Sequence, residues 1–587
     1  MQKKYPLVLS VFMIVFLIST AAIPMGSNDS GFKTSQPAML TAVMPEVVVT
    51  PLLTVGDVLP SGFRFEAVPD GISLRTRGQG RVDLFINHET SKVPFPYNLA
   101  APTVLNGEND FDNSQVSQLI LNQYSAGVLN GSFAIDSSSG YQRFCSNYLA
   151  TSKEGFDREI LFANEEAIDY VYRQGASWPP AIGSSAEKQI GVVVALDVQT
   201  GKHHPIYGMG RHNHENSVPI PGFDDLVVLS GDDTFTNGAL TTFPAGVARA
   251  QSQLYSYIAP DTDTLLADDG DLWAFVSDTA GYDDYYDFIP GSTQVVTGRF
   301  IKVPKNIATG LNPDGSEIKA ADVGFPLPPT DGSWQRDNRT TVLTGLDGPQ
   351  WVLEYWSQTN NVFRFVRVED IAYDKRPGHE NEVYVVDSGR GTTGAIGAGK
   401  STNGRVWKMV FDSSDPTVVT SLTVFVEGDD NPVKTLTEVH QPDNIETTAI
   451  GILLTEDPGS SQQFILADQG LSNATTARLM WVPFVGNGAG ASQTVVKVNQ
   501  SADEGATDVD INTAAGNWGA WESTGIVDAS EAFGPGYFLI NVQAATLWVE
   551  KAPGDDNTGP LGVPDGLPDF TYKRSGGQLL LIKIPGL

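Results

Sequence analysis

The sequence predicts an all-β fold, a β-propeller, from three observations. Apolar runs of four to six residues bounded by Gly, Asp, Asn and Pro dominate the 587-residue chain, and long helical periodicity is scarce. A short apolar strand that ends in a carboxylate or amide recurs along the chain, as expected for radially repeated blades. The composition shows no break after residue 56, so we expect a single propeller domain over residues 56–587.

The recurring strand ends carry oxygen ligands. The six copies end in Asn87-His88-Glu89, Asn164-Glu165-Glu166, Gly231-Asp232-Asp233, Val386-Asp387, Thr455-Glu456-Asp457 and Ile540-Asn541. If the strands are radially arranged, these ends meet at one place, where carboxylate and amide oxygens would suit a hard cation such as calcium. Each Asp taken alone, Asp387 or Asp457 for example, is more typical of a turn that bonds its own backbone.

The N-terminus has the pattern of a secretory signal peptide. Lys3 and Lys4 precede an apolar run and a small-residue zone, so we expect a signal peptide over residues 1–26 and a secreted protein without stable membrane association after cleavage. An uncleaved anchor is the alternative, because the apolar stretch approaches spanning length. Residues 27–55 have no clear period and are interpreted as a linker or edge segment.

The chain carries a formal net charge of −32, which disfavours binding to nucleic acid or anionic lipid. The acidity is explained either by a solvated surface or by carboxylates that hold divalent cations. Cys145 is the single cysteine, so the chain has no internal disulfide. We expect Cys145 to be a small buried residue, with metal ligation as the less favoured interpretation.

A second polar position precedes several of these strands by about one hairpin. Glu215, Glu369, Asn444 and Glu522 occupy it, and a propeller blade explains the spacing if a loop residue enters the central channel before the innermost strand. Glu is a poor turn former, which favours a functional role for Glu215 and Glu369. Among the nearby histidines, we expect His214 to hydrogen bond around Glu215 and not to bind metal.

The segment from about 278 to 345 interrupts the rhythm. It contains Tyr- and Asp-rich sequence followed by Pro- and Gly-rich sequence, so we expect a long insertion, either near the mouth of the channel or on a decorated blade.

The motifs together resemble the PhoX-type alkaline phosphatases, a family of secreted propellers that contain the DUF839-like domain. The matching segments are Asn87-His88-Glu89, Asn164-Glu165-Glu166, His214-Glu215 with Gly231-Asp232-Asp233, Arg367-Val368-Glu369, Gly404-Arg405-Val406-Trp407, Pro442-Asp443-Asn444 and Glu522-Ser523-Thr524-Gly525 with Asn541-Val542-Gln543. Each segment is short, and their shared order carries the resemblance.

The resemblance implies six blades and hydrolysis of a small phosphomonoester at a central iron–calcium cluster, by a monomeric secreted enzyme. Glu215 and Glu369 match positions that bind iron, and Arg367 matches an arginine beside the substrate, so these three are the implied catalytic residues. Glu89, Glu165, Glu166, Asp443 and Glu522 are the implied calcium ligands. Such chemistry needs no serine nucleophile, and the sequence has no G-x-S-x-G pattern.

Three departures from the family bear on the metal. Asn164 stands where the family has a cysteine, Val368 replaces a proline, and Ala544-Ala545 replace a histidine and a proline. A thiolate favours softer metals and an amide oxygen suits calcium, so Asn164 counts against iron and calcium is the expected cofactor. Cys145 could replace the lost ligand only if the fold returns it to the channel.

Two other functions remain open. One is a non-catalytic, calcium-binding propeller that binds a ligand or partner, which the degraded motifs favour. The other is a calcium-dependent lactonase or esterase, by analogy of fold alone.

Overall fold

The computed structural model describes most of the chain after residue 29. The described residues are 30–90, 115–136, 139–167, 170–171, 188–234, 252–328, 347–389, 403–428, 438–457, 476–500, 521–550 and 573–587. The expected signal peptide lies outside them. None of the helices in these ranges is long and apolar enough to cross a membrane.

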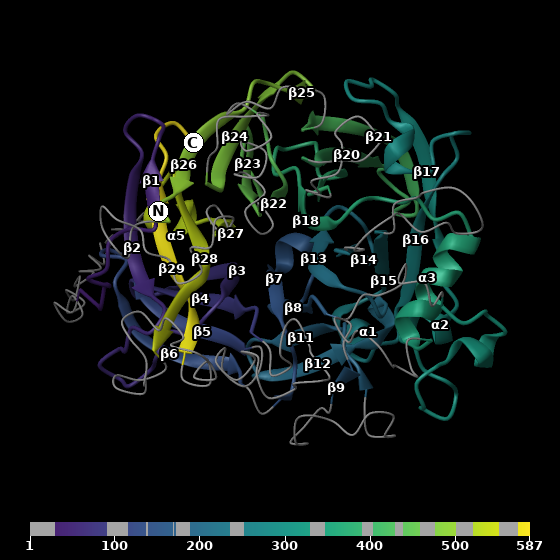
Figure 1. Cartoon of the computed structure of the whole chain (residues 1–587), viewed down its shortest axis with the longest axis horizontal. Coiled ribbons are helices and arrows are strands. Elements are labelled where there is room, and N and C mark those ends of the chain that lie inside the picture. Colours follow the sequence, from purple (N-terminus) through teal and green to yellow (C-terminus); the bar gives the residue numbers. More distant parts are fainter. Residues whose placement is uncertain are drawn as a thin grey trace, which may run out of the picture.

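Six inner strands surround a central axis (Figure 1). They are β3 (Pro69–Gly78), β7 (Phe144–Ala150), β13 (His214–Ile220), β18 (Val368–Tyr373), β22 (Pro442–Thr447) and β27 (Glu522–Asp528). Each contacts the next in this order, and β27 contacts β3, so the ring is closed. The prediction of a six-bladed β-propeller is confirmed.

Each inner strand begins an antiparallel sheet whose further strands lie progressively farther from the axis. Blade 1 continues with β4 (Arg81–His88), β5 (Gln115–Asn122) and β6 (Val128–Ile135), and blade 2 with β8 (Ile160–Glu165), β11 (Val193–Asp197) and β12 (Lys202–Ile206). Blade 3 continues with β14 (Leu226–Asp232), β15 (Leu254–Ala259) and β16 (Asp271–Ser277), and blade 4 with β19 (Glu382–Asp387), β20 (Arg405–Phe411) and β21 (Val418–Glu427). Blade 5 contains β23 (Gly451–Glu456), β24 (Arg478–Val485), β25 (Gly488–Ala489) and β26 (Gln493–Val498), and blade 6 contains β28 (Tyr537–Glu550) and β29 (Lys573–Lys583). A separate short pair is formed by β9 (Tyr170–Val171) and β10 (Lys188–Gln189).

The N-terminal segment supplies outer strands to the last two blades. Strand β2 (Val48–Thr54) pairs with β29 in blade 6, and β1 (Leu40–Ala42) pairs with β26 in blade 5. The segment over 27–55, which the sequence left as a linker or edge segment, therefore contributes edge strands. The ring is closed by strands from both ends of the chain.

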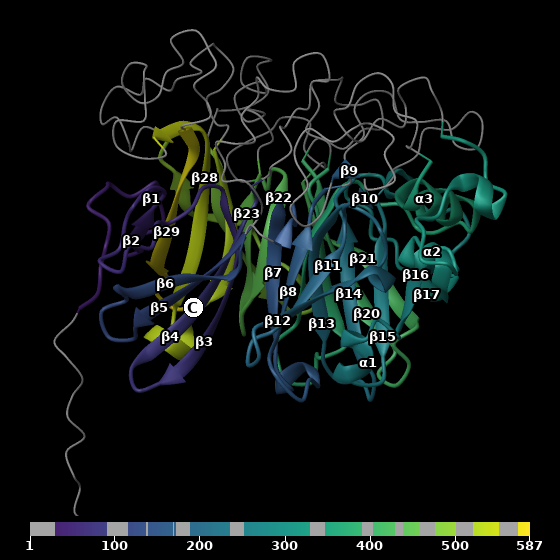
Figure 2. The same cartoon turned by 90° about the horizontal axis from the view of Figure 1, so that it is seen from below.

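The insertion decorates the outer side of blades 3 and 4. Its strand β17 (Val296–Lys302) pairs with both β16 and β21, which joins the two blades into one curved nine-stranded sheet. Two helices, α2 (Lys305–Thr309) and α3 (Pro349–Thr359), lie at the outer edge of the molecule in both views (Figures 1 and 2). The interpretation as a decorated blade is the one that the described residues support. The remaining helices are the short α1 (Thr262–Leu266) and α5 (Ser530–Phe533).

The core lies between adjacent blades. Between blades 3 and 4, for example, Leu229 and Val218 pack with Val385 and Trp407, all at most 1% exposed. Every residue of β14 is buried, because both faces of the strand are covered by neighbouring blades. This explains why strands in this chain appear as continuous apolar runs without polar alternation.

Candidate metal centre

All six inner strands contain a β-bulge at the same place. In each, two residues of the inner strand lie opposite one residue of the second strand. The bulged pairs are Asp70-Gly71, Cys145-Ser146, Glu215-Asn216, Glu369-Asp370, Asp443-Asn444 and Gly525-Ile526. Because bulges change the direction of side chains, the repeated bulge places a carboxylate or thiol at the first position in five blades and a glycine in the sixth.

A second set of polar side chains follows the end of the second strand. Backbone N–H groups of Glu89, Glu166, Asp233, Ser388 and Asp457 donate to the carbonyl oxygens of Val68, Arg143, Asn213, Arg367 and Gln441, respectively, at 2.9–3.0 Å. One hydrogen bond is thus repeated in five blades. It holds these side chains at equivalent positions beside the bulged residues.

Four of the accepting residues adopt left-handed backbone conformations. Val68, Arg143, Arg367 and Gln441 have φ values of 46°, 42°, 62° and 48°. Such conformations are unfavourable for residues other than glycine and cluster at functional sites. Arg143 and Arg367 occupy equivalent positions in blades 2 and 4.

The two sets of side chains form one continuous cluster of candidate ligands. Three groups each have ligand atoms within 4.8 Å of one another: Asp70, Glu89 and Cys145; Cys145, Glu166 and Glu215; and Glu215, Glu369 and Asp443. Cys145 joins the first two groups and Glu215 joins the last two. We call Asp70, Glu89, Cys145 and Glu166 the thiol end of the cluster, and Glu369 and Asp443 the carboxylate end, with Glu215 between them.

The cluster concentrates negative charge in a buried space. Burial and the neighbouring Glu89 raise the pKa of Asp70 to about 7. Burial and adjacent carboxylates likewise raise the pKa values of Glu166, Glu215 and Asp443 well above their usual range. Without cations these groups cannot all ionise together, so the site favours either protonation or bound positive charge.

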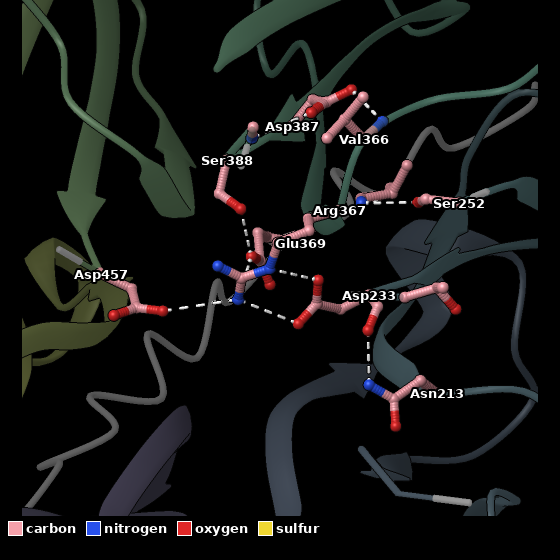
Figure 3. A network of polar contacts seen from close by, with 12 residues as sticks. Asn213, Asp233, Ser252, Val366, Arg367, Glu369, Asp387, Ser388 and Asp457 are labelled. Carbon is pink, nitrogen blue, oxygen red and sulfur yellow. Dashed lines mark hydrogen bonds and ion pairs between the residues drawn. The ribbon is translucent and has the colours of Figure 1, made fainter. Parts of the chain in front are cut away.

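Arg367 supplies part of that positive charge (Figure 3). Its Nε and Nη2 donate to the two oxygens of Asp233 at 2.8 and 3.0 Å. Its Nη2 also lies 2.9 Å from Oε1 of Glu369 and 3.5 Å from Oδ2 of Asp457. The Ser388 hydroxyl donates to the same Glu369 oxygen at 2.6 Å. The guanidinium therefore lies among carboxylates from three blades, at the carboxylate end.

The fold brings Cys145 into the channel. Its Sγ donates to Oδ2 of Asp70 at 3.3 Å, and burial together with Asp70 and Glu215 raises the pKa of the thiol well above its ordinary value. The bulge at Cys145-Ser146 lies directly opposite Asn164, the residue that stands in place of a cysteine in the motif that the sequence resembles. The chain thus places a thiol on the strand adjacent to that position.

Asn164 lies in the same wall. Its Nδ2 donates to the Ser146 carbonyl at 2.8 Å, while its Oδ1 is fully buried and has no hydrogen-bond partner within the described residues. A buried acceptor without a partner is costly, which is consistent with a cation nearby.

The other residues singled out in the sequence fall into two classes. Glu165 does not belong to the cluster, because its two oxygens accept three backbone N–H groups, from Gln142, Gly191 and Val192, at 3.0–3.1 Å. It ties the blade together and is no longer a candidate ligand. Glu522 lies outside the three groups, but burial, Asp457 and Asp443 raise its pKa, so it adds to the charge of the channel.

The structure also shows the hydrogen-bond partners of Asp387, Asp457 and His214. Asp387 accepts from the N–H groups of Val366 and Gly389, as expected for a turn residue, whereas Asp457 reaches Arg367 in the channel. His214 bonds Ser230 Oγ at 2.8 Å and the Gly210 carbonyl at 3.1 Å through its two ring nitrogens. Both nitrogens are engaged by Ser230 and Gly210, so these two hydrogen bonds go to residues other than Glu215, around which the sequence predicted them. Burial lowers its pKa to about 3.

The sequence analysis did not identify Arg143 and Asp70 as channel residues. Arg143 is close enough to Glu89 to favour its charged form. Arg143 immediately precedes the first residue of β7 as Arg367 precedes that of β18, and this shared position is a signal that could have identified it.

No protein-family model and no curated protein sequence matches the chain. Among solved structures, the chain is similar to a glycoside hydrolase family 43 arabinoxylan arabinofuranohydrolase from Bacillus subtilis, at 11% identity over 88% of this chain and 92% of that one, with a TM-score of 0.27. It is also similar to the intramolecular trans-sialidase from Ruminococcus gnavus, at 8% identity over 84% and 93% of the two chains, with a TM-score of 0.26.

A third similar structure is the Pyrococcus horikoshii acylaminoacyl peptidase, at 8% identity and a TM-score of 0.24. The match covers 72% of this chain and 45% of that one, so this chain spans less than half of the peptidase. Similarities at this level carry no argument about function. The fold assignment rests on the closed ring of inner strands, and the functional argument on the cluster.

Proposed function

We propose that this protein is a secreted, metal-dependent hydrolase of small phosphomonoesters, with its site at the cluster in the central channel. The observation that carries the proposal is that Cys145 and Glu215 join three groups of candidate ligands into one cluster. Arg367 lies beside the carboxylate end of this cluster. The order of motifs that resembles the PhoX-type phosphatases supports the same reaction.

The residues present fit more than one divalent cation. The carboxylate end offers oxygen atoms from Glu215, Glu369 and Asp443, the donor type that calcium prefers. The thiol end adds the sulfur of Cys145, which favours a softer metal such as iron or zinc. Bound cations would supply charge neutralisation and polarisation of the phosphoryl oxygens. The thiol of Cys145, which lies opposite Asn164, supports a proposal that includes a softer metal beside calcium.

Arg367 is the residue best placed to bind the phosphoryl group. Guanidinium groups pair well with phosphate because two N–H donors of the planar fork can donate to two oxygens of the tetrahedral phosphoryl group at once. Two donors of Arg367 are directed to Asp233, which fixes the plane of the guanidinium, and its side chain is 14% exposed. We therefore expect Arg367 to orient the substrate, while Glu215 and Glu369 hold the cations against it.

A second candidate is a non-catalytic, calcium-binding propeller. The observation that favours it is the pairing of Arg367 with Asp233, Glu369 and Asp457, which satisfies the guanidinium without a substrate. In that case the arginine would serve to hold three blades together around calcium.

The test is elemental analysis of the purified protein together with an assay on p-nitrophenyl phosphate in added calcium. Turnover that is lost in Arg367→Ala, with metal content retained, supports the phosphatase. The exposed residue Asp224 provides a control, because Asp224→Asn should change neither quantity. Bound calcium without turnover would contradict the phosphatase and leave the calcium-binding propeller.

A further inference from the structure

Two arginines occupy the same ring position in blades 2 and 4. Arg143 and Arg367 immediately precede the first residues of the inner strands β7 and β18. Their carbonyl oxygens accept from the N–H groups of Glu166 and Ser388 at 2.9 and 3.0 Å, in the hydrogen bond that is repeated around the ring. Both adopt left-handed φ values, 42° and 62°, which are unfavourable for arginine. The fold therefore positions the backbone of the two residues in the same way.

A second hydrogen bond fixes the segment before each arginine. Glu165 Oε1 accepts from the N–H of Gln142 at 3.0 Å, and Asp387 Oδ2 accepts from the N–H of Val366 at 2.9 Å. Both carboxylates belong to the last residue of a second strand, β8 or β19. A strained backbone persists only where the surrounding structure holds it, and such positions cluster at functional sites. The repeated hydrogen bonds supply that support for both arginines.

Each arginine lies beside a carboxylate of the preceding blade. Arg367 of blade 4 donates to both oxygens of Asp233 in blade 3 (Figure 3). Glu89 occupies the equivalent position in blade 1, because the N–H groups of Glu89 and Asp233 both donate in the repeated hydrogen bond. Burial raises the pKa of Glu89, and the nearby guanidinium of Arg143 opposes that rise. Arg143 therefore lies at the thiol end of the cluster, as Arg367 lies at the carboxylate end.

Asn213 lies between the two arginines, in blade 3. It has the same ring position, since its carbonyl accepts from the N–H of Asp233 at 2.9 Å. Its Nδ2 lies 3.4 Å from Oε1 of Glu166, in blade 2, and donates to the Asp233 carbonyl. The amide thus links the residues that follow the second strands of two neighbouring blades.

Three successive blades present N–H donors from this one ring position. We call Arg143, Asn213 and Arg367 the donor row. Blades 1 and 5 have Val68 and Gln441 at the same position, so the cationic groups of these five blades lie on one side of the channel. The donor row therefore gives the channel two positively charged points, with one blade between them.

We propose that the donor row selects phosphomonoesters whose leaving group carries a carboxylate, with the phosphoryl group beside Arg367 and the carboxylate beside Arg143. The inference rests on the proposed function and names the substrate class of that site. Two guanidinium groups separated by one blade suit two separate anionic groups. A carboxylate adds one negative charge, whereas a second phosphate adds about two, so the acidic channel repels the carboxylate less.

The test is calorimetric titration of the full protein in saturating calcium with 2-carboxyethylphosphonate and with propylphosphonate, which has a methyl group in place of the carboxylate. Phosphonates are not hydrolysed, so binding is measured independently of turnover. We expect 2-carboxyethylphosphonate to bind at least about tenfold more tightly, as for one charge-assisted pair. Equal affinities, or no binding of either probe, would overturn the inference.

Three variants locate the carboxylate. Arg143→Gln should bring the two affinities within about twofold of each other and leave that for propylphosphonate unchanged, which also shows that the variant is folded. Arg143→Lys should keep part of the preference, because the charge remains. Arg299→Gln removes a 55% exposed arginine on the outer strand β17 and should change neither affinity. If Arg143→Gln weakens both probes equally, Arg143 does not select the carboxylate and the inference is wrong.

An assay of p-nitrophenyl phosphate turnover separates this inference from the proposed function. Turnover without discrimination between the two phosphonates contradicts the role of the donor row and leaves the phosphatase. Discrimination that depends on Arg143, without turnover, contradicts the phosphatase and supports the donor row as the site that recognises the two anionic groups.

Discussion

At the thiol end of the channel, Cys145 lies among carboxylates from blades 1 and 2. The adjacent wall contains the amide oxygen of Asn164, which has no hydrogen-bond partner in the described part of the chain. At the carboxylate end, Glu369 and Asp443 from blades 4 and 5 offer oxygen alone and lie beside Arg367. The same bulge builds both ends, so the backbone is equivalent, and the two ends differ in the side chains at the first bulge position and after the second strand. One repeated backbone feature can therefore supply, within one ring, a site suited to hard cations and a site suited to softer metals.

The largest expected effect comes from Glu215, which lies between the two ends and belongs to a ligand group at each. Glu215→Gln should remove cations from both, because it takes a negative charge from each of the two groups it joins. We expect a loss of at least about 100-fold in p-nitrophenyl phosphate turnover, together with lower metal content by elemental analysis. If the metal content equals that of the Asp224→Asn control, Glu215 does not join two sites.

Removing bound cations with a chelator should make the repulsion among the carboxylates measurable as a loss of stability. In the folded protein the pKa of Asp70 is about 7, above its ordinary value of 3.8. Between about pH 4 and pH 7 the folded state therefore binds more protons than the unfolded state. The free energy of unfolding of the chelated protein should therefore fall as pH rises from about 4 to 7. Calcium should reduce this dependence, because bound cations replace the protons.

Urea denaturation at pH 5 and pH 7.5, with and without calcium, provides the measurement. An acid-side maximum of stability that persists unchanged in saturating calcium would argue that the cluster does not bind it.

Cys145→Ser tests whether the two ends of the cluster bind metal independently. It should lower the affinity for zinc or iron by at least about tenfold while calcium binding at the carboxylate end is retained. Competition between calcium and zinc, followed by elemental analysis, measures this. Loss of calcium in parallel with zinc would show that the two ends act as one site.

Glu522 is expected to have the smallest effect. It lies outside the three ligand groups and acts on the channel through its charge, so Glu522→Gln should weaken calcium binding only about two- to fivefold. A calcium titration with a fluorescent competitor is sensitive enough for this change. An effect as large as that of Glu215→Gln would make Glu522 a direct ligand.

The apolar runs and polar strand ends predicted the blades well, because strands buried on both faces leave a clear signal in the sequence. The β-bulge left no such signal. The spacing in the sequence placed Glu522 at the position equivalent to Glu215 and Glu369. In the structure the strand register places Gly525 at that position. Tight packing explains the glycine, since a Cβ at Gly525 would meet the backbone of Asp70.

Cys145 and Asn164 illustrate a second limit. They are well separated in the sequence but lie opposite each other in a hairpin, and only the register of β7 and β8 reveals this. The joining of blades 3 and 4 by β17 was equally hidden, because the pairing of outer strands depends on the geometry of the whole ring.

The pairing of β2 with β29 joins strands that are far apart in the sequence. Blade 6 is complete only when the outer strand β2 has paired with β29. Pairings of such long sequence separation form slowly. The candidate ligands from Asp70 to Asp443 likewise come from inner strands that are far apart in the sequence, so they form one cluster only in the folded ring.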